Sequence, residues 1–144
     1  MIRQAKTADF EAIYDLVKEL AEYENEPDAV TSKIEDYIHA FSQNNIYVLV
    51  AEEEDEIIGM ALYYKAFSTW KGPMMYLEDF VVKSNARRNG IGQQLFDAFL
   101  QDSKDRGAIM VKWQVLDWNE LAINFYKKNG ATIEKEWLNG KIIF

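Results

Sequence analysis

The order in which helical and strand-like patterns follow one another constrains the fold of this chain most. Residues 2–5 form a short candidate strand, and apolar residues at helical spacing then occupy residues 10–21 and 34–41. Ser32 and Glu35 precede the second stripe at the spacing of a capping box. The first part of the chain is therefore predicted to be a strand followed by two amphipathic helices.

After residue 45 the pattern changes to short β-rich runs that alternate with helical stripes. The predicted elements here are strands at 46–51, 57–64 and 74–82, a helix at 90–104, a strand at 109–116, a helix at 119–128, and strands at 131–138 and 141–144. The charged residues 52–56 indicate an antiparallel hairpin, and Asn139-Gly140 is a type I′ turn signal between the last two strands. The order β-α-α-β-β-β-α-β-α-β-β predicts one mixed α/β domain of the α+β type over residues 1–144, with a mostly antiparallel sheet flanked by helices.

Composition limits the classes of function. The net charge of −8 speaks against a nucleic-acid partner and is compatible with a cationic ligand. The chain has no cysteine, which excludes disulfides, thiolate zinc sites and a cysteine nucleophile, and its one histidine, His39, leaves no histidine-based triad. No apolar run reaches the ~20 residues that span a bilayer, and no signal peptide is recognisable at the N-terminus. We expect a cytoplasmic protein without a membrane partner.

The segment Arg-Arg-Asn-Gly-Ile-Gly at residues 87–92 lies between a predicted strand and a predicted helix. Two glycines one residue apart let the backbone approach a ligand closely, and a helix N-terminus directs N–H groups and a positive dipole end toward an anion. The P-loop pattern does not occur, and a dinucleotide fingerprint would need a third glycine where Leu95 stands. Taken alone, the segment fits either a pyrophosphate site or an ordinary glycine turn with solvated arginines.

The pattern Arg-x-x-Gly-x-Gly at this junction resembles the acetyl-CoA motif of the GNAT N-acetyltransferase superfamily, and the order of elements is similar to that fold. Residues 18–24, 76–80, 118–120 and 123–127 together resemble the spermidine/spermine (diamine) acetyltransferase branch, which includes relatives that act on thialysine. The resemblance runs in register from about residue 2 to residue 130. The branch usually has a glycine where Arg88 stands, so this loop is bulkier and more basic.

The resemblance implies acetyl-CoA as co-substrate, without a metal ion. The backbone of one strand would pair with the pantetheine arm, the glycine loop would hold the pyrophosphate, and the start of the last helix would form a second contact. The residues implied in acetyl-CoA binding are Phe80, Val81, Val82, Arg87, Arg88, Asn89, Gly90, Ile91, Gly92, Gln93, Asn119, Glu120, Leu121 and Ala122.

The resemblance also assigns the chemistry to a few side chains. Tyr126 would donate a proton to the leaving sulfur, although a residue in this setting is also typical of an aromatic core. Glu78 would bind the amine and assist its deprotonation through water, with Asp79 as support, although Glu78 also fits an edge-strand carboxylate that faces solvent. Adjacent residues of a regular strand point to opposite faces, so the two carboxylates are expected on different sides. Tyr23 and Glu24 resemble substrate-binding positions, but they also fit a solvated acidic stretch.

The sequence therefore predicts a GNAT-fold amine N-acetyltransferase that acts on a diamine, polyamine or thialysine-like substrate by direct attack in a ternary complex. A homodimer is implied by the resemblance. The alternatives are a GNAT enzyme for another amine, such as an antibiotic amino group or a protein lysine, and an acetyl-CoA-binding sensor without turnover.

Overall fold

The computed structural model describes residues 1–87 and 89–144, and its tertiary contacts divide the chain into two units, residues 1–114 and 115–144. The elements of the first unit are β1 (Ile2–Gln4), a 3₁₀ turn (Thr7–Asp9), α1 (Phe10–Tyr23), a 3₁₀ turn (Pro27–Ala29), α2 (Ile34–Ser42), β2 (Tyr47–Glu53), β3 (Glu56–Ser68), β4 (Gly72–Val82), a 3₁₀ turn (Ser84–Ala86), α3 (Ile91–Asp105) and β5 (Met110–Trp113). The second unit contains α4 (Glu120–Lys128).

The five strands form one sheet in the order β1-β2-β3-β4-β5. All neighbouring pairs are antiparallel except β4 and β5, which are parallel and are joined through α3. Glu54 and Asp55 connect β2 to β3 with φ angles of 50° and 63°, the left-handed conformation that a two-residue type I′ turn requires. The predicted hairpin and the mostly antiparallel sheet are confirmed.

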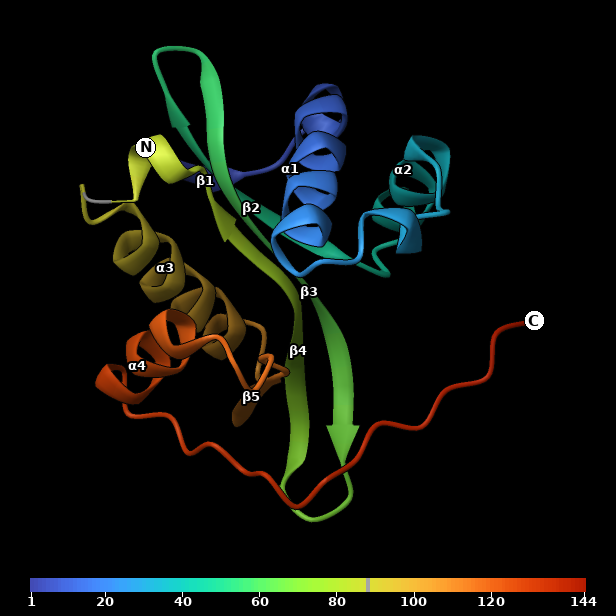
Figure 1. Ribbon diagram of the computed structural model, residues 1–144, viewed down its shortest axis with the longest axis vertical. Helices are drawn as coiled ribbons and strands as arrows, with labels where there is room; N and C mark the ends of the chain where they lie inside the picture. The colour runs from blue at the N-terminus through green and yellow to red at the C-terminus, as the bar shows by residue number, and fades with distance from the viewer. Residues whose placement is uncertain (88) are drawn as a thin grey trace. The chain divides into compact units, whose positions relative to one another are not determined.

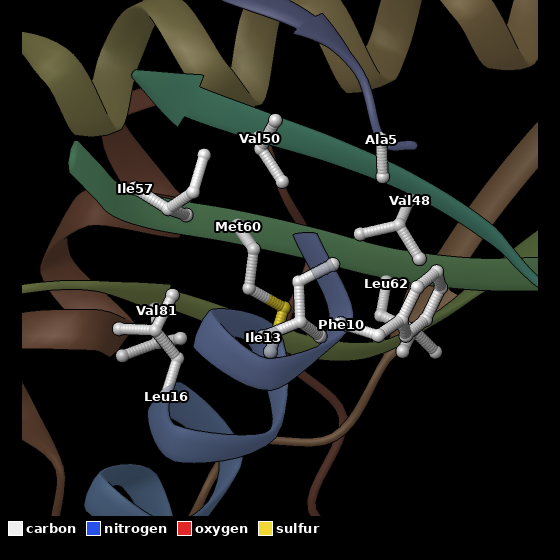
Figure 2. Packing of buried hydrophobic residues seen from close by; sticks show 10 residues of the cluster. All are labelled: Ala5, Phe10, Ile13, Leu16, Val48, Val50, Ile57, Met60, Leu62 and Val81. Carbon is white, nitrogen blue, oxygen red and sulfur yellow. The ribbon is translucent and has the colours of Figure 1, made fainter. Parts of the chain in front are cut away.

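Helices α1 and α2 cover one face of the sheet, and α3 covers the other (Figure 1). Phe10, Ile13 and Leu16 of α1 point into a buried cluster with side chains of β2, β3 and β4 (Figure 2). On the opposite face, the ring of Tyr63 lies 4.9 Å from that of Phe99 on α3. The helical stripe predicted at residues 10–21 is therefore the core-facing side of α1.

Leu16→Ala is expected to lower the free energy of unfolding by about 2–5 kcal/mol, because it removes a fully buried side chain and leaves a cavity. Urea denaturation would measure the loss. Glu19→Ala, on the exposed side of the same helix, should change it by only about 0.5 kcal/mol or less. Equal effects of the two substitutions would contradict the packing of α1 described above.

The predicted cap of the second helix is wrong by one residue. The N-cap of α2 is Lys33, whose backbone N–H donates to the Asp36 carboxylate at 2.8 Å, so Glu35 is not the capping acid. The hydroxyl of Ser32 donates instead to the Tyr37 hydroxyl at 3.1 Å. Since α2 starts at Ile34, Asp36 and not Glu35 occupies the third helical position, from which a side chain reaches back to the N-cap.

In the second unit, the helix predicted at residues 119–128 is confirmed as α4. The Asn119 side chain caps it by accepting from the Ala122 N–H at 3.2 Å, and Gly130, with φ 84°, follows its end. The strands predicted at residues 131–138 and 141–144 are wrong, since residues 131–144 contain no strand. The apolar side chains of this segment, such as Trp137 and Ile142, are exposed. A lone two-stranded hairpin without an apolar surface to cover is marginally stable at best.

Candidate active site

A β-bulge in β4 shapes the candidate site. Leu62 of β3 pairs with Asp79, but the next residue of β3, Tyr63, pairs with Leu77, so Glu78 has no partner in the ladder. Such an extra residue interrupts the alternation of side chains along the strand. Leu77 and Tyr63 lie on the face of the sheet that α3 covers. The carboxylates of Glu78 and Asp79 lie on the opposite face, together with Leu62, which α1 covers. The expectation that Glu78 and Asp79 point to opposite faces is therefore wrong.

Contacts on the α1 face agree with this register. The hydroxyl of Tyr64 donates to the Glu78 carboxylate at 3.0 Å, and the ring of Tyr64 stacks on that of Tyr76 with 5.5 Å between centroids. Burial, together with the negative charges of Glu78 and Asp79, raises the pKa of Tyr64 to about 12. This phenol therefore stays protonated and remains a donor to Glu78.

The carboxylate of Glu24, just after α1, lies near enough to the carboxylates of β4 for its charge to act on Asp79. Burial raises the pKa of Glu24. Burial also raises the pKa of Asp79, with further contributions from the charges of Glu78 and then Glu24, to about 7. Among the described residues, none of the three forms an ion pair. The carboxylate cluster of Glu24, Glu78 and Asp79 is thus a concentration of negative charge that a cation would stabilise.

Helix α2 contributes Tyr37 to the surroundings of this cluster. Burial raises the pKa of the Tyr37 phenol, and the charge of Asp79 adds to the effect. The Tyr37 ring meets that of Tyr14 edge-on at 5.5 Å, and the Tyr14 hydroxyl donates to the Ser32 carbonyl at 2.8 Å. Sequence analysis gave Asp79 only a supporting part, because no pattern in the apolar run 74–82 signals a bulge. It missed Tyr37 and Tyr64, because their places depend on the packing of α2 and on the pairing of β3 with β4.

The glycine loop leads into the start of α3. Gly90 is the N-cap of α3 and has φ 74°, a conformation that favours glycine. A Cβ on Gly92 would meet only the Val82 side chain, at 4.0 Å, among the described residues outside its own helix. The fold therefore does not itself require a glycine at 92, and the open space lies beside the first turn of α3, where backbone N–H groups lack helical partners.

Arg87 and Tyr23 lie together beside this loop. The Arg87 side chain donates to the Val82 carbonyl at 2.9 Å, and its guanidinium lies 5.5 Å from the centre of the Tyr23 ring. Tyr23, which is predicted to bind substrate, is thus in contact with Arg87, which is predicted to bind acetyl-CoA. Asn89, in the same loop, donates its backbone N–H to the Ala86 carbonyl at 3.5 Å. The prediction for Arg88 falls outside the described residues.

Strands β4 and β5 part before β4 ends. Their last pair is Leu77 with Trp113, whereas β4 continues to Val82. Phe80, Val81 and Val82, predicted to face the pantetheine arm, lie in this extension. The side chain of Val81 is buried in the α1 core, and the extension pairs with β3 but has no pair with β5.

The other predicted residues lie at the ends of two helices. Ile91 and Gln93 stand with Gly92 in the first turn of α3. Glu120, Leu121 and Ala122 form the first turn of α4, and Tyr126 is the buried residue of that helix. These α4 residues belong to the second unit. The described part of the chain contains neither a group of three acidic or histidine side chains that could hold a metal ion nor a helix long and apolar enough to cross a membrane.

Comparison with known proteins identifies the family. Residues 10–131 match the family model described as acetyltransferase (GNAT) family. The chain is 38% identical to thialysine N-epsilon-acetyltransferase of Bos taurus over 142 residues, which cover 91% of this chain and 83% of the relative. It is 33% identical to spermidine/spermine N(1)-acetyltransferase-like protein 1 of Homo sapiens, over 90% of this chain and 20% of that protein.

Solved structures agree at the level of the fold. An aminoglycoside acetyltransferase from an uncultured soil metagenomic sample, solved in complex with sisomicin, superposes with a TM-score of 0.82 at 24% identity, over 100% of this chain and 95% of that one. The extent of the family match and the identity to curated relatives over most of the chain leave no other assignment: this chain belongs to the GNAT acetyltransferase family and is an acetyl-CoA-dependent N-acetyltransferase.

Proposed function

We propose that the protein transfers the acetyl group of acetyl-CoA to a primary amine of a small cationic substrate, such as a diamine, a polyamine or a thialysine-like amino acid. The observation that carries this proposal is the carboxylate cluster formed by Glu78 and Asp79, on one face of the bulged strand, and by Glu24, just after α1. A substrate with a positive charge relieves the repulsion within the cluster. The names of the relatives, which refer to thialysine and to spermidine/spermine, support the same class of substrate.

The acetyl-CoA site would use two parts of the first unit. Gly90 and Gly92, with Arg87 beside them, would receive the pyrophosphate at the start of α3, where an added Cβ would fill open space. The backbone of β4 beyond its last pair with β5 would receive the pantetheine arm. In the second unit, residues 119–122 would form the contact with acetyl-CoA that the family resemblance implies.

Transfer would occur by direct attack of the amine on the thioester within a ternary complex. An alkylammonium has a pKa around 10, by analogy with lysine, so the substrate must lose a proton before it attacks. Glu78 would hold the ammonium group. Tyr126 would protonate the leaving thiolate, since a phenol with a reference pKa of about 10 is protonated at neutral pH and so has a proton to donate. The absence of cysteine leaves no thiol for an acyl-enzyme route.

Glu78→Gln is expected to raise the KM for a diamine roughly tenfold or more. The variant keeps the shape of the side chain but loses its charge, and a charge-assisted contact is typically worth about 1.5–3 kcal/mol, where ~1.4 kcal/mol is one decade. The KM for acetyl-CoA should change far less. In the wild type, the KM for the amine should also rise with ionic strength, because salt screens attraction into an acidic cleft.

Glu53→Gln is the matched control, because it removes one negative charge at the exposed end of the β2–β3 hairpin. Both substrates' KM values would be measured at low and high salt for the wild type and both variants. If Glu78→Gln handled diamines as well as the wild type, Glu78 would have no part in substrate binding.

An amine panel tests the function itself. Thiol release from acetyl-CoA would be followed with and without spermidine, putrescine, thialysine, an aminoglycoside and a lysine-containing peptide. Release that depends on the small cationic amines supports the proposal. Release with the aminoglycoside or the peptide alone would assign another substrate class, and no release with bound acetyl-CoA would identify a sensor.

We further propose that both units form one N-acetyltransferase domain over residues 1–144, which the family match across residues 10–131 supports. We propose a cytoplasmic homodimer without nucleic-acid or membrane partners, as the resemblance and the composition imply. Light scattering coupled to size exclusion would test the dimer.

A further inference from the structure

We propose that Phe96 of α3 is a positioning residue for acetyl-CoA. Its ring sets the distance between α3 and the β4 extension, residues 78–82, which continue beyond the last pair of β4 with β5. The inference rests on the proposed function, in which the first turn of α3 receives the pyrophosphate and the β4 extension receives the pantetheine arm. Only 1% of Phe96 is exposed, so it acts through the strands that it contacts.

Phe96 lies where β4 and β5 part. The last pair of the two strands joins Leu77 to Trp113. The ring of Phe96 meets that of Trp113 with 5.7 Å between centroids and an angle of 90° between the planes. It meets the ring of Phe80 at 5.7 Å and 77°. One side chain of α3 therefore packs edge-to-face on both strands, on β5 at its last pair and on β4 beyond that pair.

The strand pairing explains why Phe80 points toward α3. Val81 and its partner Met60 both lie in the buried cluster that α1 covers, so the neighbouring Phe80 points to the opposite face. Regular alternation from Leu77, which lies on the α3 face, would put Phe80 on the α1 face. The extra residue Glu78 reverses this alternation. The bulge thus supplies the aromatic partner of Phe96.

Helix α3 runs along the β4 extension from its first turn onward. Gly92 and Phe96 are four residues apart and lie on the same side of the helix. A Cβ on Gly92 would lie 4.0 Å from the Val82 side chain, and Phe96 contacts Phe80 in the same extension. Because protein interiors are close-packed, the size of the Phe96 side chain sets how closely the first turn of α3 approaches the strand.

This distance matters because the pyrophosphate and the pantetheine arm belong to one molecule. Binding of one part places the other at a high effective concentration, and this advantage is lost when the two sites are no longer matched to the ligand. A misplacement of about 1 Å can also cost about 10²-fold in rate when it moves a reacting group. The Phe96 ring therefore supports both the affinity for acetyl-CoA and the placement of its thioester.

Phe96→Leu tests the inference. The smaller side chain should let α3 shift toward the β4 extension and raise the Kd of acetyl-CoA roughly tenfold, as titration calorimetry on the folded variant would measure. ADP, which carries a pyrophosphate but no pantetheine arm, is the second probe. Its inhibition constant against acetyl-CoA should be the same in the wild type and in Phe96→Leu, because the first turn of α3 itself is unchanged.

Phe10→Leu is the matched control. Phe10 is likewise fully buried, with 0% exposed, but it lies in the α1 cluster on the opposite face of the sheet. Both variants should lower Tm, because each removes part of a buried ring. Phe10→Leu should leave the Kd of acetyl-CoA as in the wild type, which separates positioning from a general loss of stability.

Trp113→Leu extends the test to a side chain that is only partly buried, and it replaces Phe96→Leu if that variant does not fold. It removes the other aromatic contact of Phe96 and should also raise the Kd of acetyl-CoA. If the two rings act through one contact, the double variant should raise the Kd by less than the product of the two single effects.

The outcomes separate this inference from the proposed function. An unchanged Kd in Phe96→Leu, or in Trp113→Leu where it replaces that variant, would make Phe96 an ordinary core residue and overturn the inference. An equal rise in the inhibition constant of ADP would overturn it too, because the pyrophosphate site itself would then be damaged. A wild-type protein that binds acetyl-CoA but acetylates none of the amines would overturn the proposed function, and the Kd values would still decide the role of Phe96.

Discussion

Gly92→Glu is expected to abolish acetyl-CoA binding while leaving the protein folded. A Cβ at this position would come only within 4.0 Å of the Val82 side chain, so the substitution has room in the fold. A carboxylate in the first turn of α3 should even favour the helix, because it lies near the positive end of the dipole. Loss of binding would therefore report on the ligand and not on folding.

The size of the effect follows from charge. Two like charges about 4 Å apart repel by about 4 kcal/mol at an effective dielectric constant of about 20, which is nearly three decades in Kd. The added side chain also blocks the approach of pyrophosphate to the backbone. Titration calorimetry with acetyl-CoA would measure Kd, and circular dichroism would check the fold.

Gly140→Glu is the matched control for this substitution. It makes the same change of residue and charge in the second unit, where a Cβ would meet no atom within 4 Å among the described residues. Its Kd should equal that of the wild type. An unchanged Kd in Gly92→Glu would remove the glycine loop from the acetyl-CoA site.

Tyr126→Phe is expected to lower kcat by about 10²–10⁴-fold, the usual range for a positioned acid or base, with little change in acetyl-CoA affinity. The variant keeps the buried ring of α4 and removes only the hydroxyl. If the phenol protonates the leaving thiolate, the loss should appear in kcat and not in either KM. Steady-state kinetics together with calorimetry would separate these quantities.

Tyr47→Phe serves as the control, because it removes a phenol oxygen from β2, on a residue that has no part in the proposed chemistry. Its kcat should match that of the wild type. A Tyr126→Phe protein with near-normal kcat and reduced stability would instead show that Tyr126 is a core aromatic.

Local patterns predicted most elements of the first unit. The stripe at residues 10–21 became α1 because helical periodicity determines which side chains can share one buried face. The β2–β3 hairpin was predicted from two β-rich runs around a charged turn, and Glu54 and Asp55 adopt the left-handed conformation that such a turn demands. Cap positions were predicted less accurately than the helices themselves. Asp36, and not the expected Glu35, is the capping acid of α2, because a shift of one residue changes which side chain reaches the N-cap.

The candidate site was predicted only in part. The glycine loop lies at a strand–helix junction, as its sequence indicated, and Glu24 and Glu78 do come close enough for their charges to act on one buried group. Glu78 and Asp79 were expected on opposite faces of the strand, but the bulge brings both to one face, and Tyr37 and Tyr64 were missed. Each of these depends on how strands pair and how helices pack across the sheet, which no short-range pattern encodes.

The sequence by itself determined the order and type of the elements up to residue 128, because periodicity and turn chemistry are properties of neighbouring residues. Its motifs also resemble those of the family to which the comparisons assign the chain. Only the tertiary structure decided that Glu78 is the bulged residue, that Glu24 joins it, that Arg87 meets Tyr23, and that residues 131–144 form no strand. Register and burial are collective: a strand pairs where its neighbours and their packing allow, and an apolar run forms a strand only where a partner surface covers it.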